Sequence, residues 1–174
     1  MVSGRRRTGR PPTANEIVKL LHGADKSGVV NLAGLPAGDR QSFLKDLTPK
    51  LSDLRARLGH PHWVTVDETH HLLPANDAAT ESIPLGNGES VLHITESPRL
   101  VAREVLDATS LFIAIGARGQ SLLEEFCEVS GVTPPARQVA ALDATAALVW
   151  RPKLPDAQPF RLNTVARQKD EAGA

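Results

Sequence analysis

The sequence is poor in aromatic residues and in cysteine, and each shortage excludes a class of protein. Aromatic residues make up 3% of the 174 positions, and tyrosine is absent. A stacking platform for single-stranded nucleic acid is therefore not expected, because such platforms are built from aromatic side chains. The one cysteine, Cys127, cannot form an internal disulfide. It lies beside Phe126 in a predicted helix, which favours a buried thiol over a catalytic nucleophile.

Long apolar runs and an excess of one charge are also missing. No apolar run exceeds five residues, which excludes a transmembrane helix, and the first ten residues lack the apolar stretch of a secretory signal. Twenty Lys and Arg residues balance twenty Asp and Glu residues, so no global field attracts nucleic acid or anionic lipid. Together with the single cysteine, these features predict a cytoplasmic protein with no membrane partner.

What remains is the composition of a globular domain, with 41% apolar and 23% charged residues. Residues 1–12 contain four arginines and end in two prolines, which predicts a disordered basic leader; an arm that contacts phosphates is the alternative. The core is expected at residues 13–133, a C-terminal extension at 134–166 and a disordered tail at 167–174.

Hydrophobic periodicity predicts strands that alternate with helices, and therefore an α/β fold. The alternation implies crossover connections, hence a parallel sheet with flanking helices, and the last two strands predict a C-terminal β-hairpin. Pro49 lies inside the longest helix, where a kink or a break is expected. The strands are predicted at residues 28–33, 63–66, 91–95, 111–115, 145–150 and 159–165, and the helices at 14–22, 39–58, 98–108 and 120–129.

Two adjacent carboxylates, Asp67 and Glu68, follow the strand predicted at residues 63–66. In an open α/β sheet, ligands bind at the carboxyl ends of the strands. Neighbouring residues at a strand end point in different directions, so one acid can face a hydrated Mg²⁺ while the other orients a water. Nucleotide hydrolysis needs both tasks. The simpler interpretation is that the two acids cap the N-terminus of a helix.

The segment W-V-T-V-D-E-T-H-H-L-L-P at residues 63–74 resembles the Walker B segment of RecA-like P-loop ATPases, particularly the HerA-like group and its conjugative-transfer relatives. The blocks at residues 29–36 and 111–116 resemble neighbouring parts of the same domain. The resemblance covers about residues 14–165. More narrowly, it is to the C-terminal half of the ATPase domain in bacterial proteins that join a HAD-type phosphatase to a HerA-like ATPase. It implies a partial RecA-like P-loop NTPase fold.

The resemblance also implies roles for individual residues, with ATP and Mg²⁺ as cofactors. Asp67 would hold Mg²⁺ through water, and Glu68 would act as the catalytic base or position the attacking water. Thr95 matches the polar sensor near the γ-phosphate. His70 or His71 would relay the nucleotide state to the following loop, although a structural role is the alternative for both histidines.

The phosphate loop of that family, G-x-x-x-x-G-K-[ST], is absent from the sequence. The nearest segment contains Lys26 and Ser27, but Asp25 stands where glycine is required and would repel phosphate. No cofactor-binding residue is therefore assigned, and the chain alone is expected to bind Mg·ATP weakly. An upstream segment or subunit is expected to supply Walker A. The strand that carries this loop would lie between the strands predicted at residues 91–95 and 111–115. Without it, these two strands either pair directly or leave an unpaired edge.

Three other functions stay open. The chain could be a non-catalytic assembly module, that is, a degenerate half of an ATPase, since HerA-like ATPases form rings of identical subunits. Nucleic acid is also an open possibility as a partner, although no motif supports it. Residues 67–70 also fit the D-E-x-H box of helicases, with Arg118 as an arginine finger or a solvated charge. The histidines at positions 60, 62, 70 and 71 lack H-E-x-x-H spacing, which argues against a zinc enzyme. We favour ATP hydrolysis as part of a larger protein or complex.

Overall fold

The computed structural model describes residues 11–23, 26–59, 62–75, 90–139, 142–154 and 158–163. The chain divides into two compact units, residues 1–94 and residues 95–174, and each is described by itself. Most of the predicted leader and all of the predicted tail lie outside the described residues. Within the described ranges, no helix is both long and apolar enough to cross a bilayer.

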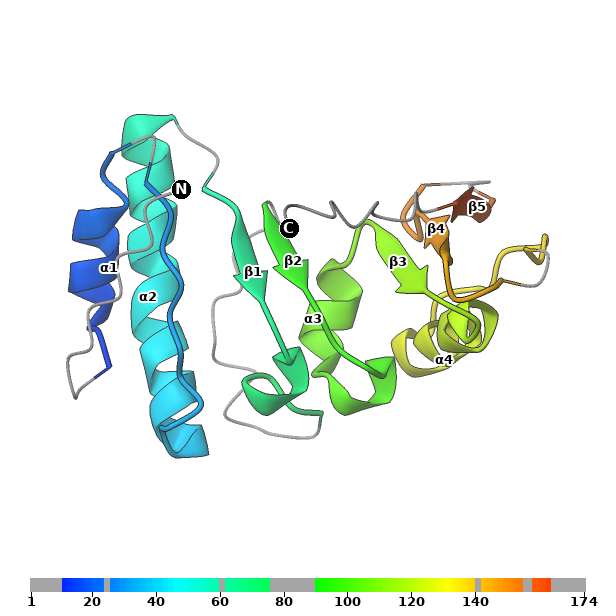
Figure 1. The fold of residues 1–174 in the computed structure, drawn as a ribbon, viewed down its shortest axis with the longest axis horizontal. Coiled ribbons are helices and arrows are strands. Elements are labelled where there is room, and N and C mark those ends of the chain that lie inside the picture. Colours follow the sequence, from blue (N-terminus) through cyan, green and yellow to red (C-terminus); the bar gives the residue numbers. More distant parts are fainter. Residues whose placement is uncertain are drawn as a thin grey trace, which may run out of the picture. The chain divides into compact units, whose positions relative to one another are not determined.

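The first unit begins with two helices that pack side by side, α1 (Ala14–Leu20) and α2 (Ala37–Leu58) (Figure 1). Helix α1 begins with a capping box, as a threonine three residues before a glutamate predicts: the N–H of Glu16 donates to Oγ1 of Thr13 at 3.3 Å, and the N–H of Thr13 donates to Oε2 of Glu16 at 2.8 Å. The buried contact between the helices is made by Ala14, Ile17, Leu47 and Leu51.

Helix α2 runs through Pro49 as a single element, so the break allowed for at this position does not occur. The hydroxyl of Thr48 donates to the carbonyl of Leu44 at 2.8 Å, which adds a side-chain hydrogen bond just before the proline. Gly59 ends the helix in the left-handed conformation, φ 67°, as its position after the last apolar residue predicts. Near this end, Arg55 donates hydrogen bonds to the carbonyls of His62 and Ser90 and so ties α2 to the segments before both strands of the unit.

The strand predicted at residues 28–33 is wrong. These residues form no strand, and Val29 is 99% exposed. The side chain of Asn31 instead accepts the N–H of Ala33 at 2.9 Å, and Arg40 donates to the carbonyls of Leu35 at 2.7 Å and Ala33 at 3.2 Å. Side-chain hydrogen bonds of this kind occupy backbone groups that a ladder would need.

Strands β1 (Val64–Val66) and β2 (Val91–His93) lie side by side and pair in parallel, with Val64 opposite Val91 and Val66 opposite His93 (Figure 1). This confirms the parallel arrangement for these two strands. Among the described residues they form a two-stranded sheet, and the direct pairing of β2 with the strand near residues 111–115 does not occur. Residues 76–89, in the connection between the two strands, lie outside the described residues.

The second unit is an antiparallel sheet with helices, which corrects the prediction of one parallel sheet. Strand β3 (Phe112–Ile115) pairs antiparallel with β4 (Ala146–Trp150). Strand β4 in turn pairs antiparallel with β5 (Phe160–Asn163), which confirms the predicted C-terminal hairpin. The helix predicted at residues 98–108 is divided in two by Val101, whose backbone is extended. The elements of this unit are η2 (Pro98–Leu100), α3 (Arg103–Ala108), β3 (Phe112–Ile115), α4 (Gly119–Ser130), β4 (Ala146–Trp150) and β5 (Phe160–Asn163).

Helix α4 packs on one face of this sheet. The ring of Phe126 lies 5.0 Å from that of Phe112 and 6.4 Å from that of Trp150, measured between centroids. Cys127 is 3% exposed, which confirms its predicted burial, and burial raises the pKa of its thiol. The opposite face is apolar and partly exposed. Cross-strand rows place Ile113 and Ile115 of β3, and Phe160 and Leu162 of β5, on this side, each about half exposed or more, whereas Ala147 and Val149 of β4 between them are buried.

Candidate functional site

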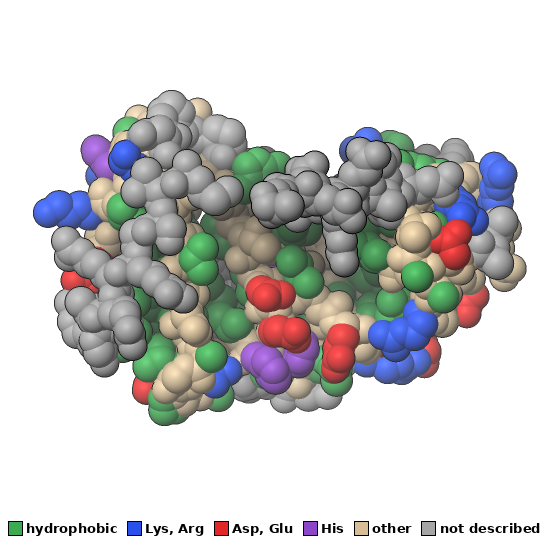
Figure 2. Space-filling view, in the orientation of Figure 1, with side chains coloured by type: hydrophobic (Ala, Val, Ile, Leu, Met, Phe, Trp, Pro, Cys, Tyr) green, Lys and Arg blue, Asp and Glu red, His purple; other side chains and the backbone are tan. Residues whose placement is uncertain are grey.

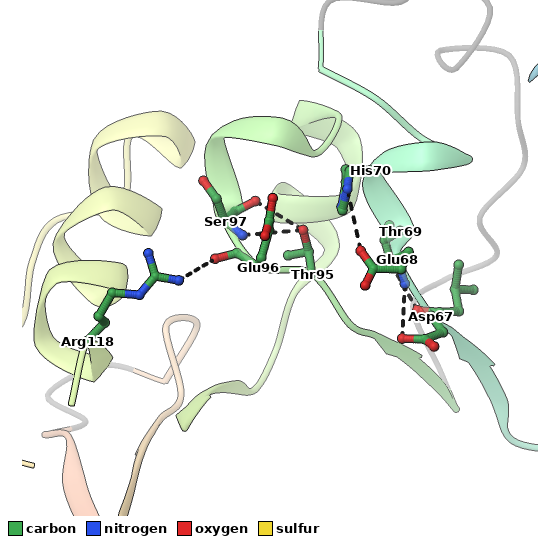
Figure 3. Close-up of polar contacts among 9 residues, drawn as sticks. Asp67, Glu68, Thr69, His70, Thr95, Glu96, Ser97 and Arg118 are labelled. Atoms are coloured by element: carbon green, nitrogen blue, oxygen red, sulfur yellow. Dashed lines mark hydrogen bonds and ion pairs between the residues drawn. The ribbon is translucent and has the colours of Figure 1, made fainter. Parts of the chain in front are cut away.

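Asp67 and Glu68 directly follow β1, at its carboxyl end, and both side chains are exposed. Oδ1 of Asp67 accepts the backbone N–H of Glu68 at 3.1 Å (Figure 3). The first acid is thereby oriented by the backbone of the second. Exposed carboxylates with this local support can bind a hydrated cation or accept a proton from water.

The backbone of Glu68 is left-handed, with φ 49° and ψ 52°. This conformation costs a residue with a side chain about 1–2 kcal/mol, and it persists where the surroundings hold it. Here the carbonyl of Glu68 accepts the N–H of His71 at 2.8 Å, which begins the short 3₁₀ helix η1 (Thr69–His71). The chain therefore turns sharply at Glu68 and places the following histidines next to it.

Thr69 anchors the turn that carries the acids. Its side chain is fully buried, its hydroxyl donates to the carbonyl of Val66 at 3.0 Å, and its N–H donates to the carbonyl of Ile94 at 2.8 Å. Thr69 is thus hydrogen-bonded to the last residue of β1 and to the residue directly after β2. No role was predicted for Thr69. The one feature of the sequence that could have marked it as part of the site is its position directly after the two acids.

His93, at the end of β2, was also missed. Its Nδ1 lies 3.5 Å from the hydroxyl of Thr69, and burial lowers its pKa, so the neutral imidazole is favoured beneath the turn. A histidine that ends a strand pattern gives no signal in one sequence that separates it from an exposed residue. His93 is partly exposed and supports the turn through its contact with the buried Thr69.

The two predicted relay histidines lie beside the catalytic candidate. Nε2 of His70 is 3.5 Å from Oε2 of Glu68 (Figure 3). The rings of His70 and His71 are 4.3 Å apart between centroids. His71 is exposed, whereas the side chain of His70 is 13% exposed. The histidine earlier in the chain, His62, is used elsewhere: its Nε2 lies 3.0 Å from the carbonyl oxygen of Leu21. His60 lies outside the described residues.

Thr95 and Arg118 belong to the second compact unit. The hydroxyl of Thr95 donates to the carbonyl of Ser97 at 3.2 Å and accepts the N–H of Ser97 at 3.5 Å, a local turn (Figure 3). Arg118 is exposed and donates to the carbonyl of Glu96 at 3.4 Å. These contacts explain the local conformation of both residues, while the sensor and arginine-finger roles remain predictions.

Acidic and histidine side chains gather together on the face shown in Figure 2. In the first unit the described members with mutually close ligand atoms are Glu68, His70 and His71. Carboxylate oxygen suits Mg²⁺, and imidazole nitrogen suits Zn²⁺ and other transition metals. The surface therefore offers two kinds of cation ligand on one short turn.

Comparison with known proteins shows the fold. No protein-family model and no curated protein match the sequence. Among solved structures, the chain is similar to the genome packaging NTPase B204 from Sulfolobus turreted icosahedral virus 2. The complex with AMPPCP gives a TM-score of 0.60 at 13% identity, over 95% of this chain and 79% of that one. The complex with ATP-gammaS gives 0.59 at 13% identity over the same shares. The sulfate complex gives 0.53 at 15% identity, over 72% and 63%. The likeness shows that the chain shares its fold with this NTPase.

Proposed function

We propose that this chain is the part of an ATP-hydrolysing enzyme of the HerA-like type that supplies the Walker B acids. The observation that carries the proposal is the turn after β1, which presents Asp67 and Glu68 to solvent from a parallel strand pair and fixes them through the buried Thr69. The similar fold belongs to an NTPase solved with AMPPCP and with ATP-gammaS. Both findings support a nucleotide as the ligand of this turn.

In this proposal the two acids divide the chemistry. Asp67 holds Mg²⁺ through water and neutralises charge on the phosphates, and Glu68 orients the attacking water. Thr95 senses the γ-phosphate through its hydroxyl. The narrower resemblance, to ATPase domains fused to HAD-type phosphatases, belongs to the same proposal.

The phosphate loop comes from another segment or a partner subunit. In the described part of the chain, β2 is paired on one side by β1, and β3 on one side by β4, so each leaves one edge without a strand. Unpaired edges bind further strands readily, because their N–H and C=O groups are already aligned. A strand that carries a phosphate loop, with its lysine, would satisfy such an edge and complete the nucleotide site.

Calorimetric titration of Mg·ATP into the purified chain tests this function, with Asp67→Asn beside it. Asp53→Asn is the matched control, because Asp53 is an exposed acid on α2, in the same unit. We expect wild type and Asp53→Asn to bind in the millimolar range, about −4 kcal/mol, and Asp67→Asn more weakly still. Micromolar binding that Asp67→Asn loses would contradict the separate phosphate loop. Equal binding by all three proteins would contradict the role of Asp67.

A second function, a non-catalytic assembly module, is favoured by the apolar side chains that are exposed on β3 and β5, on the face of the sheet opposite α4. Ile115 is 69% exposed and Phe160 53% exposed on that face, although sheets usually bury apolar faces against a partner. If assembly is the function, Ile115→Lys weakens association measured by analytical ultracentrifugation. Leu154→Lys, at an exposed apolar residue in the connection after β4, leaves it unchanged.

A further inference from the structure

The turn after β1 also gathers a carboxylate and two imidazoles at one point, independently of any nucleotide. One ligand atom from each of Glu68, His70 and His71 lies within 4.8 Å of the other two. We infer that these three side chains bind a divalent transition-metal ion, of the Zn²⁺ or Co²⁺ kind, at the surface of the first unit.

The backbone explains why three neighbouring residues can share one ion. Glu68 precedes η1 in the left-handed conformation, and its carbonyl accepts the N–H of His71 at 2.8 Å. This sharp turn brings the two side chains together, and one ligand atom of Glu68 lies within 4.8 Å of one of His71. His70 completes the group, since its Nε2 already lies 3.5 Å from Oε2 of Glu68.

The separations are close to what a metal requires. Two ligands of a tetrahedral zinc ion are about 3.3 Å apart, given bond lengths of about 2.0 Å. The Glu68–His70 pair meets this distance within a few tenths of an ångström. The widest separation between ligand atoms in the group is at most 4.8 Å. Rotation of the side chains of Glu68 and His71, which are both exposed, can shorten this distance. Three protein ligands would leave a fourth position for water or a substrate atom.

The chemistry of the group selects the ion. Two imidazole nitrogens and one carboxylate oxygen favour Zn²⁺, Co²⁺ or Ni²⁺ over Mg²⁺, which prefers oxygen ligands. The neighbouring Asp67 is not a member of the group, and its Oδ1 accepts the N–H of Glu68 instead. Magnesium at Asp67 and a transition metal at Glu68 are therefore different binding events on one turn.

One consequence rests on the proposed function. A metal that holds the carboxylate of Glu68 prevents it from orienting water, so Zn²⁺ would inhibit hydrolysis by the completed ATPase. The metal site itself does not depend on that function, because its ligands and its test need no nucleotide.

The test is titration of the tag-free, metal-free chain with Co²⁺, followed by visible absorbance, and with Zn²⁺, followed by calorimetry. The variants are Glu68→Gln, His70→Ala and His71→Ala. His22→Ala is the matched control, because His22 is an exposed histidine of the same unit outside the group. Circular dichroism verifies that each variant is folded. If His70→Ala fails to fold, Glu68→Gln and His71→Ala still test the metal site, because both of these residues are exposed.

We expect one ion per chain, and an affinity reduced about tenfold or more in each ligand variant but unchanged in His22→Ala. A large excess of Mg²⁺ should leave the Zn²⁺ affinity the same. The inference is overturned if the chain binds neither metal, if Glu68→Gln and His71→Ala bind as tightly as His22→Ala, or if Mg²⁺ displaces the ion. Inhibition of hydrolysis by Zn²⁺ tests the consequence separately, so its failure would leave the binding result intact.

Discussion

The hydroxyl of Thr69 donates to the carbonyl of Val66 at 3.0 Å, across the two acids that lie between them. This hydrogen bond closes the turn that presents Asp67 and Glu68, and it is fully buried. The geometry of the candidate site is therefore set by a residue that touches no solvent. Its removal should change the turn before it changes any other part of the unit.

Replacing Thr69 with valine should destabilise the chain by about 1 kcal/mol, because the shape is kept while the carbonyl of Val66 loses one of its two donors and keeps the N–H of Ile94 at 2.9 Å. Urea unfolding followed by circular dichroism measures the change. Thr65→Val is the matched control, since Thr65 is an exposed threonine on β1, and it should shift the free energy of unfolding by less than about 0.5 kcal/mol. Equal effects of the two substitutions would contradict the anchoring role of Thr69.

Glu68→Gly should stabilise the chain by up to about 1 kcal/mol, because glycine adopts the left-handed conformation without the penalty that a side chain brings. The same substitution at Glu104, an exposed residue of helix α3, should destabilise by about 1 kcal/mol. Thermal and urea unfolding of the two variants should thus give opposite signs. A loss of stability in Glu68→Gly as large as that in Glu104→Gly would refute strain at this residue.

The free energy of unfolding should decrease as the pH is lowered and His93 becomes protonated. Burial lowers the pKa of His93 in the folded chain, so the unfolded chain takes up the proton first. The stabilisation is complete above about pH 6.5 and is lost as the pH falls from there toward the folded-state pKa. Urea unfolding at several pH values between about 7.5 and 5.5 measures the effect. In His93→Gln the decline should be shallower than in wild type and in the control His22→Gln. Parallel curves for all three would exclude this contribution.

Cys127 should react slowly with thiol reagents in the native chain. Burial raises the pKa of its thiol and shields the sulfur, so little thiolate is available at neutral pH. Labelling with a chromogenic disulfide should therefore be much slower in buffer than in denaturing urea, where the same sulfur is exposed. Comparable rates under the two conditions would show that α4 does not protect it.

Local features of this chain are readable from its sequence. The capping box of Thr13 and Glu16, the apolar spacing of α2 and the two acids after β1 all depend on residues a few positions apart. Such patterns fix the start of a helix, its buried face and the end of a strand without any distant partner. The predicted location of Asp67 and Glu68 at a strand end followed from the same local signal.

Long-range pairing and backbone conformation are not readable in that way. The antiparallel pairing of Phe112 with Trp150 joins segments almost forty positions apart, and alternating helices and strands favoured a parallel sheet instead. At residues 28–33 the chain forms side-chain hydrogen bonds in place of a strand: Oδ1 of Asn31 accepts the N–H of Ala33, and Arg40 donates to the carbonyl of Ala33. The left-handed conformation of Glu68 likewise escapes a spacing argument. The spacing argued against a zinc enzyme, whereas the structure brings ligand atoms of Glu68 and the two neighbouring histidines within 4.8 Å of one another.

The central claim is that Asp67 and Glu68 act on magnesium-bound nucleotide. Amide chemical shifts of the ¹⁵N-labelled chain, followed during titration with millimolar Mg·ATP, test it most directly, with Asp67→Asn and Asp53→Asn measured in parallel. We expect the largest shifts at residues 67–71; they should require Mg²⁺, disappear in Asp67→Asn and persist in Asp53→Asn. Shifts that arise elsewhere, or that persist unchanged in Asp67→Asn, would contradict it.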